Sequence, residues 1–297
     1  MLVSSASVLA SQPSVADRST TSSAGGGSAA YETRKAVDEY LQFHYADPAD
    51  FLPYENGPQE ALAFTSRLAA LCERNCLALQ DFTGEQPEAR ALDIGCAVGG
   101  ASFELARAFP NVVGIDYSHQ FVQAAQDMKD NGIAQYTVVQ EADITETRQA
   151  AVPADIDRER VVFRQGDACN LPAMAPFDCI LAANLLCRLP EPLKLLHRLP
   201  DLVADDGIAV IVSPYSWLEA WTPKSNWLGG YLKDGHPVRS EDALSDVMEK
   251  HFDMVDSDDV PFLIREHARK YQWGISHATV WRRRPRSEDS HNWFDKA

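Results

Sequence analysis

From Ala89 onward, short apolar runs alternate with segments that have helical spacing. The apolar runs cover residues 91–95, 112–116, 161–165, 178–183 and 208–213. Apolar positions recur every three or four residues over 101–109 and again over 119–130, which predicts helices between and after the first two runs. Strands that alternate with helices in this way are typical of βαβ units. The pattern therefore predicts a doubly wound α/β fold with a mostly parallel sheet.

The segments on either side of this pattern predict further elements. A helix is expected over 33–45, a turn over 53–58 and a second helix over 59–80, so that residues 31–88 form a helical cap on the core, 89–285. Strand-like alternation at Tyr136 and Val138 predicts an inserted hairpin within 134–150. Ser240 is the expected N-cap of a helix that runs to about 251. Strands over 254–260 and 277–282 are predicted to close the core.

The two ends of the chain differ in composition from the rest. Residues 1–30 are rich in Ser, Ala and Gly and nearly uncharged, which predicts a disordered tail. A targeting peptide has weak support, because Arg18 is the only basic residue there and Asp17 precedes it. Residues 286–297 are expected to form a short C-terminal tail.

Charge and cysteine content exclude several classes of function. The formal net charge is −16 and the sequence pI is about 4.8, which disfavours binding to the phosphate backbone of a nucleic acid. No apolar stretch approaches the ~18–20 residues of a membrane-spanning helix, so we expect a soluble protein with no membrane partner. The six cysteines form no CxxC pair, which predicts reduced thiols and a cytoplasmic location. Without HxxxH or HxH pairs, no metal site is expected.

The strongest local signal is Ala91-Leu92-Asp93-Ile94-Gly95-Cys96-Ala97-Val98-Gly99-Gly100, an apolar strand that enters a glycine-containing turn. The next acid at a strand end is Asp116, which lies 116 − 95 = 21 residues after the first glycine. An acid at this distance holds the ribose hydroxyls in nucleotide-binding sheets. A dinucleotide fingerprint requires glycine where Ala97 stands, and a phosphate loop requires Gly-Lys-Ser/Thr, so neither motif fits.

The Asp-x-Gly-x-x-x-Gly pattern instead resembles motif I of class I S-adenosylmethionine-dependent methyltransferases. The resemblance implies a Rossmann-like, seven-stranded fold with an N-terminal helical lid, and S-adenosylmethionine as the cofactor without a metal. Asp93 would orient the methionine end, Asp116 would hold the ribose, and Asp167 and Ala168, at the end of the third strand, would contact the adenine. The other expected cofactor contacts are Gly95, Cys96, Gly99, Tyr117 and Asn184.

Longer strings carry a narrower resemblance. Residues 39–45 read Glu-Tyr-Leu-Gln-Phe-His-Tyr, residues 182–190 read Ala-Ala-Asn-Leu-Leu-Cys-Arg-Leu-Pro, and similar strings cover 213–219 and 261–281. Over about 31–283 the chain resembles the methyltransferase domain of ovothiol biosynthesis, which methylates an imidazole nitrogen of 5-thiohistidine. Many members carry an iron-dependent sulfoxide synthase ahead of this domain. It is absent from this sequence, so transient contact with a separate synthase is an expectation.

The topology expected from the family brings three segments together above the cofactor: 184–188, 213–217 and 265–267. The turn between the last two strands, 262–274, would supply the third segment. Asn184, Tyr215 and His267 are the predicted catalytic residues. Arg188 and Arg265 are candidates for a substrate carboxylate and Glu266 for an α-amino group, because guanidinium groups bind carboxylates in two-pronged fashion. Tyr31, Lys35 and Tyr40 are expected to contribute a lid.

Three readings of the function remain open at this point. The first is an N-methyltransferase for 5-thiohistidine, a small-molecule substrate. The second is a methyltransferase for another small thioimidazole or amino acid. The third is a non-catalytic scaffold that binds the cofactor, which the complete set of acids and glycines disfavours.

Overall fold

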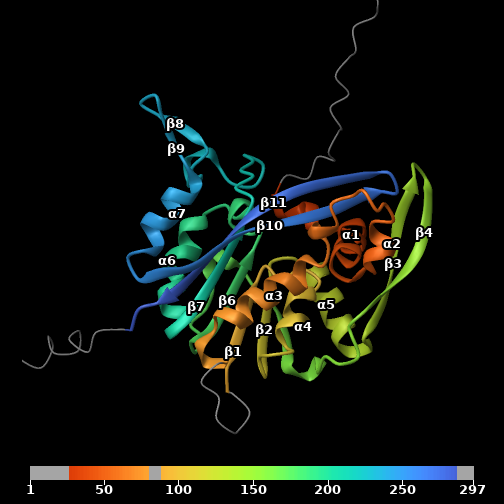
Figure 1. Ribbon diagram of the computed structural model, residues 1–297, viewed down its shortest axis with the longest axis horizontal. Helices are drawn as coiled ribbons and strands as arrows, with labels where there is room; N and C mark the ends of the chain where they lie inside the picture. The colour runs from red at the N-terminus through yellow and green to blue at the C-terminus, as the bar shows by residue number, and fades with distance from the viewer. Residues whose placement is uncertain (1–26, 80–87, 286–297) are drawn as a thin grey trace, which may run out of the picture.

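The computed structural model describes residues 27–79 and 88–285 (Figure 1). Within the described residues the first element is a 3₁₀ helix, η1 (Gly27–Tyr31), which lies slightly before the predicted start of order near Tyr31. Most of the predicted N-terminal tail, and all of the predicted C-terminal tail, lie outside the described residues. No helix in the described part of the chain has the length and apolar character needed to cross a membrane.

A seven-stranded sheet forms the centre of the molecule, in the order β10-β11-β7-β6-β1-β2-β5. Five strands are parallel, and β11 and β10 add to β7 in antiparallel fashion. This arrangement confirms the predicted fold class. The strands are β1 (Arg90–Ile94), β2 (Asn111–Asp116), β5 (Val161–Gln165), β6 (Phe177–Ala183), β7 (Val203–Ser213), β10 (Phe252–His267) and β11 (Lys270–Arg283).

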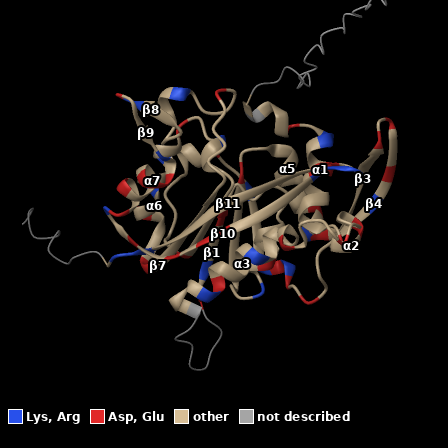
Figure 2. Cartoon of the chain, turned by 45° about the horizontal axis from the view of Figure 1, so that its top comes forward, with Lys and Arg blue, Asp and Glu red and all other residues tan. Residues whose placement is uncertain are grey.

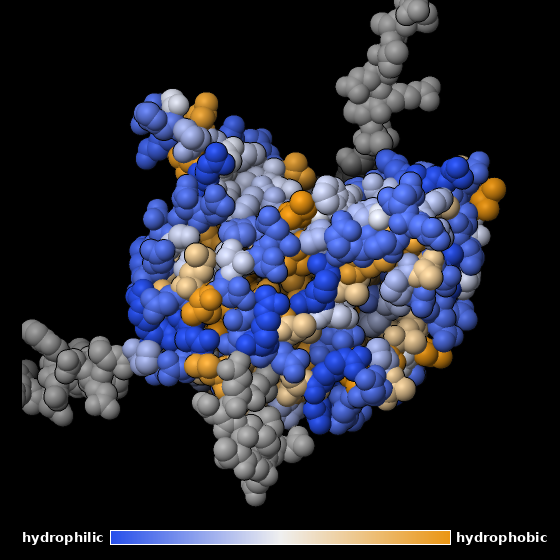
Figure 3. Space-filling view, viewed as in Figure 1, coloured by the Kyte–Doolittle hydropathy of each residue, from blue (hydrophilic) through white to orange (hydrophobic). Residues whose placement is uncertain are grey.

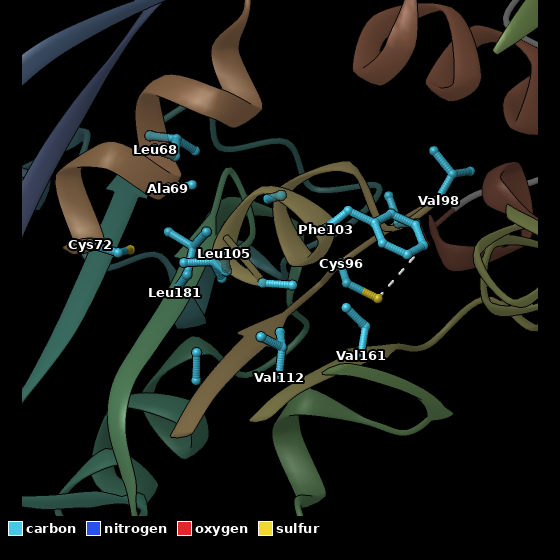
Figure 4. Close-up of a cluster of buried hydrophobic side chains, with 14 of the residues drawn as sticks. Leu68, Ala69, Cys72, Cys96, Val98, Phe103, Leu105, Val112, Val161 and Leu181 are labelled. Carbon is cyan, nitrogen blue, oxygen red and sulfur yellow. Dashed lines mark hydrogen bonds between the residues drawn. The ribbon is translucent and has the colours of Figure 1, made fainter. Parts of the chain in front are cut away.

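Helices cover both faces of the sheet. One apolar cluster joins the sheet to α1 (Arg34–Tyr45), α3 (Phe64–Asn75), α4 (Gly100–Leu105) and α5 (His119–Asn131). Figure 4 shows part of it, with Leu68 and Cys72 of α3 beside Leu105 of α4 and Leu181 of β6. A second cluster joins the other face to α6 (Pro192–Leu202) and α7 (Ser240–Met248). These two layers fix the strand ends at which the polar motifs lie.

The surface combines dispersed charge with small apolar groups. Figure 2 shows Lys and Arg positions scattered among Asp and Glu positions rather than gathered into one band. On the face drawn in Figure 3, hydrophobic residues appear in small groups separated by hydrophilic ones. The six cysteines are free and five of them are buried, as the sequence predicts.

Several predicted elements differ in extent. The helix expected over 59–80 is divided into η2 (Gln59–Ala61), α3 and η3 (Leu77–Leu79), because Ala63 takes a left-handed conformation with φ 51° just before α3. Ser240 is the first residue of α7 rather than its cap, and its hydroxyl accepts a hydrogen bond from Trp217 Nε1 (2.8 Å). The helix expected over 101–109 ends at Leu105. α6 and a small hairpin, β8 (Tyr231–Lys233) and β9 (His236–Val238), go beyond the prediction.

The largest correction concerns the last two strands. The predicted turn over 262–274 is wrong, because β10 continues to His267 and β11 resumes at Lys270, leaving a two-residue connection. The resulting ribbon extends past the sheet to the inserted hairpin, β3 (Ile133–Glu141) and β4 (Ile144–Ala151), whose existence was predicted (Figure 1). Arg265 Nη2 donates to Gln140 Oε1 (3.0 Å) at this junction. Between ribbon and hairpin lies α2 (Pro48–Phe51), where Tyr271 Oη donates to the Phe51 carbonyl (3.0 Å).

Gly114 in β2 is predicted to be intolerant of a side chain. A Cβ there would lie 2.7 Å from the Phe163 ring and 2.9 Å from Ser102 Oγ, while Phe163 also lies against Gly99. We expect Gly114→Ala to destabilise the fold by about 1–3 kcal/mol, the usual cost of overpacking. Urea unfolding measures this. Val162→Thr, at a half-exposed position of the neighbouring strand, serves as the control and should change stability by no more than ~0.5 kcal/mol. A stable Gly114→Ala protein would contradict the packing described here.

Candidate active site

A cavity of about 410 Å³ lies at the carboxyl ends of β1, β2, β5 and β6, beneath η1 and α1. Ligands of open α/β sheets bind at this edge. Most of its charged lining comes from the ends of strands, and much of its aromatic lining comes from the N-terminal segment and the loop after β7. The polar side chains include Asp93, Asp116, Asp167, Asn184 and Arg188, and the aromatic ones include Tyr31, Tyr40, Phe43, Phe64 and Trp221.

The glycine-containing turn after β1 has three left-handed residues, Gly95 (φ 79°), Ala97 (φ 47°) and Gly99 (φ 86°). Alanine is strained in this region, where glycine is not. The conformation of Ala97 is held by its own N–H, which donates to Asp116 Oδ2 (2.9 Å). A Cβ at Gly99 would lie 2.6 Å from the Phe163 ring, so glycine is required there for packing as well.

Two carboxyl groups lie beside this turn, that of the buried Asp93 and that of the partly buried Asp116. Asp116 Oδ1 accepts from Ser118 N (2.8 Å), and Asp93 Oδ2 accepts from Ser102 Oγ (2.7 Å). Burial raises the pKa of Asp93 to about 7 and that of Asp116 to about 6. A carboxylate that is buried with few partners is well placed to gain from a polar or cationic ligand.

Asp167 and Asn184 complete the polar edge. Asp167 Oδ1 accepts from Cys169 N (2.8 Å) at the start of η5 (Ala168–Asn170), which places the carboxyl group against the cavity. Asn184 has φ 53° just past β6, and its N–H donates to the Val212 carbonyl (2.8 Å). Asn184 Oδ1 accepts from Ser276 Oγ (2.7 Å), a fully buried residue of β11. The two hydrogen bonds hold a strained residue at the cavity wall.

Aromatic residues of the N-terminal segment cover the cavity. The Tyr31 ring lies 4.8 Å from that of Trp221 and 5.4 Å from that of Phe121, which is also 4.7 Å from Tyr40. Arg188 lies over Trp221 at 5.7 Å, and its Nη1 donates to the Ser216 carbonyl (2.9 Å). It is the only Lys or Arg among the described residues that line this cavity.

His44 of α1 lines the cavity too, and sequence reasoning missed it. Its Nδ1 accepts from Gly100 N (3.1 Å), the first N–H of α4. Burial lowers its pKa to about 3, so the ring is neutral and carries its proton on Nε2. A Cβ at Gly100 would lie 2.7 Å from the histidine ring. The sequence signal that could have identified His44 was the Gly99-Gly100 pair together with a histidine in the N-terminal helix α1.

Most predicted cofactor contacts come together here. Of the predicted site residues, the cavity is lined by Asp93, Gly95, Cys96, Asp116, Tyr117, Asp167, Ala168, Asn184, Arg188 and Tyr31. Gly99 shapes the turn behind it. The second segment expected above the cofactor contributes Pro214 to this lining, whereas the Tyr215 side chain points elsewhere.

The expected third segment does not reach the cavity, because the ribbon carries it past the sheet edge. Arg265 is buried against Gln140, and its Nε and Nη1 have no hydrogen-bond partner in the structure. Glu266 pairs with Lys270 (2.6 Å), and His267 Nδ1 accepts from Arg269 N (3.2 Å). The predicted convergence of residues 265–267 with Asn184 is therefore wrong.

Two other predicted residues also lie elsewhere. Tyr215, at φ 51°, has its hydroxyl 2.9 Å from His277 Nδ1 in a separate open cleft. Lys35 is 80% exposed at its side chain and lies 3.7 Å from Glu39. From the sheet edge, β10 sends Phe262 and Ile264 into the cavity instead.

Comparison with known proteins identifies a family for this chain and solved structures with a similar fold. Residues 62–253 match the family described as "Methyltransferase domain". The magnesium protoporphyrin IX methyltransferase ChlM from Synechocystis PCC 6803 with bound SAM is 15% identical, with a TM-score of 0.50 over 85% of this chain and 93% of that chain. The [4+2]-cyclase SpnF is 16% identical, with a TM-score of 0.50 over 86% and 95%. No curated protein sequence matches the chain.

The raised pKa of Asp93 predicts a pH-dependent gain from Asp93→Asn. Unfolded Asp has a pKa of about 3.9. Because the folded value is about 7, the charged group destabilises the fold increasingly as pH rises from 4 to 7, and by a constant amount above that. We expect the variant to be more stable by roughly 2–4 kcal/mol at pH 8 and unchanged below pH 4.

Chemical denaturation of the ligand-free protein at the two pH values measures this difference. Exposed Asp253, which pairs with Arg284 at 2.9 Å, provides Asp253→Asn as the control, for which no gain at pH 8 is expected. An Asp93→Asn protein that is less stable than the wild type at pH 8 would show that Asp93 is ionised and well paired in the fold.

Proposed function

The chain belongs to the methyltransferase-domain family and is an S-adenosylmethionine-dependent methyltransferase, and we propose that it methylates an imidazole ring nitrogen of 5-thiohistidine. One observation gives the main support for methyl transfer. Asp93, Asp116 and Asp167 lie at the carboxyl ends of three strands and line the same cavity as the glycine-containing turn. The acceptor is supported by the strings that resemble the ovothiol methyltransferase domain, together with Arg188 and Asn184 on one wall.

The chain's own groups fit the cofactor. Asp116 keeps its carboxylate fixed by two backbone N–H groups, which leaves lone pairs for a ribose diol. Asp167 can accept from an adenine amino group while Ala168 and Tyr117 flank the ring. Asp93 would attract the positively charged methionine end. When bound, S-adenosylmethionine supplies the methyl group on a sulfonium.

The residues proposed to contact the methyl acceptor would bind its carboxylate and orient its ring. Arg188 has one nitrogen tied to the Ser216 and Cys187 carbonyls, so its guanidinium is held while other N–H groups stay available for a carboxylate. Phe43 and Phe64, whose stacked rings lie 5.7 Å apart, and Phe262 form apolar walls of the same cavity. Methyl transfer is an in-line displacement, so positioning of the ring nitrogen and exclusion of water should supply most of the rate. Tyr31 and Tyr40 would shield the site.

The direct test is turnover. Purified protein is incubated with S-adenosylmethionine and 5-thiohistidine, products are identified by mass spectrometry, and the methyl position is assigned by NMR. Ring-N-methylated product with inert histidine supports the proposal. Cofactor binding without product would reject this acceptor in favour of another small thioimidazole or amino acid, which a panel of such compounds would identify. Absence of cofactor binding by calorimetry would contradict the proposed methyl transfer altogether.

Replacement of Arg188 tests the proposed binding of the substrate carboxylate, and the same replacement of Arg265 is its control. Arg188→Met should raise KM for 5-thiohistidine by roughly 10–100-fold, because a hydrogen bond to a charged group contributes about 1.5–3 kcal/mol. Arg265→Met removes a cation that does not line the cavity, so KM should stay within about 3-fold, with thermal unfolding as the check on folding. A larger KM effect from Arg265→Met than from Arg188→Met would overturn the assignment.

A further inference from the structure

Asn184 can turn only one edge of its amide toward the cavity. Its Oδ1 accepts the hydroxyl proton of Ser276, which is fully buried and does not line the cavity. Asn184 itself is half-buried and does line it. With the oxygen directed into the protein, the Nδ2 edge is the one left for a ligand. This edge donates hydrogen bonds and cannot accept them.

His44, which lines the same cavity from α1, shows the same arrangement. Its acceptor nitrogen, Nδ1, is occupied by the N–H of Gly100, and the glycine leaves the space that this contact needs. The neutral ring then has a proton on Nε2. Two uncharged side chains of the lining, from α1 and from the end of β6, therefore use their acceptor atoms within the protein, and their remaining donors make no hydrogen bond among the described residues.

We propose that Ser276 is a positioning residue that turns the Asn184 amide so that Asn184 and His44 present N–H donors to the methyl acceptor, which binds as its thiolate anion. The inference rests on the proposed function and names the ionisation state that the site selects. Donors of this kind favour a negatively charged sulfur over a neutral thiol, and they offer no base at the ring.

The chemistry balances without a base in the transfer step. The lone pair of the ring nitrogen forms the N–CH₃ bond, the CH₃–S⁺ bond breaks, and its electron pair stays on the cofactor sulfur. The ring gains a positive charge, which the thiolate on the same ring balances. The product is a net-neutral imidazolium thiolate, which keeps the proton on the other ring nitrogen. Because the net charge of the acceptor goes from −1 to zero during the step, the donors act on binding and orientation more than on the barrier itself.

The variant Asn184→Asp tests whether the group that faces the ligand donates or accepts a hydrogen bond. The carboxylate is nearly isosteric and still accepts the Ser276 proton, but it presents an oxygen to the thiolate. We expect kcat/KM for 5-thiohistidine to fall at least 100-fold at pH 8, with affinity for S-adenosylhomocysteine changed by less than about 5-fold. Retention of a third or more of kcat/KM would overturn the proposal, since the group facing the ligand would then act as an acceptor.

Ser276→Ala tests the positioning role, with Ser213→Ala as the control for loss of a buried hydroxyl on the neighbouring strand. We expect kcat/KM to fall about 3–10-fold, the effect of one neutral hydrogen bond. The Asn184 side-chain amide signals, assigned by their loss in Asn184→Asp, should shift and broaden in Ser276→Ala and stay unchanged in Ser213→Ala. If Ser276→Ala does not fold, Ser276→Cys, with a weaker donor, should give a smaller effect of the same kind.

The NMR experiment separates failure of the proposed substrate from failure of the proposed positioning role of Ser276. In the wild type with S-adenosylhomocysteine, addition of 5-thiohistidine should shift the Asn184 amide protons. No shift and no turnover, with Ser276→Ala still moving the amide signals, would reject the acceptor and its thiolate while supporting the Ser276 contact. Unchanged Asn184 signals in Ser276→Ala would reject the positioning role whatever the substrate.

Discussion

The hydrogen bond between Asp116 and Ala97 N is the interaction on which the site depends. It joins the end of β2 to the turn after β1, and it holds a non-glycine residue at φ 47°. The second oxygen of Asp116 accepts from Ser118 N just before α5. One carboxylate thus fixes a turn, a helix start and the edge of the cavity. These two hydrogen bonds from backbone N–H groups explain why an acid can occupy this position even though burial raises its pKa.

The N-terminal cap is attached to the same turn from above. His44 accepts from Gly100 N, and Tyr45 Oη donates to the Val98 carbonyl (2.7 Å), so consecutive residues of α1 bind consecutive parts of the turn. The aromatic cover formed by Tyr31 and Tyr40 continues from this helix. The cap, which carries the aromatic cover, is therefore joined directly to the turn by hydrogen bonds.

The sheet and the cofactor end could be predicted because their signals are local. Asp93, Asp116 and Asp167 each end an apolar run, and parallel strands place their carboxyl ends at one edge whatever the loops do. The ribbon could not be placed in this way. Alternation along β10 shows that Leu263 and Arg265 share a face opposite to Phe262 and Ile264, but it does not show which face meets the cavity. Tertiary contacts with Gln140 and α2 decide that.

The two ends of the cavity are thus encoded differently. The cofactor end lies within 93–168, whereas the proposed acceptor end combines α1, the end of β6 and β11, in which Asn184 and Ser276 are 92 residues apart. Ser276 fixes Asn184 from the antiparallel strand that is added last to the sheet. Acceptor choice can then change through residues of the cap and of β11 while the cofactor contacts stay in place.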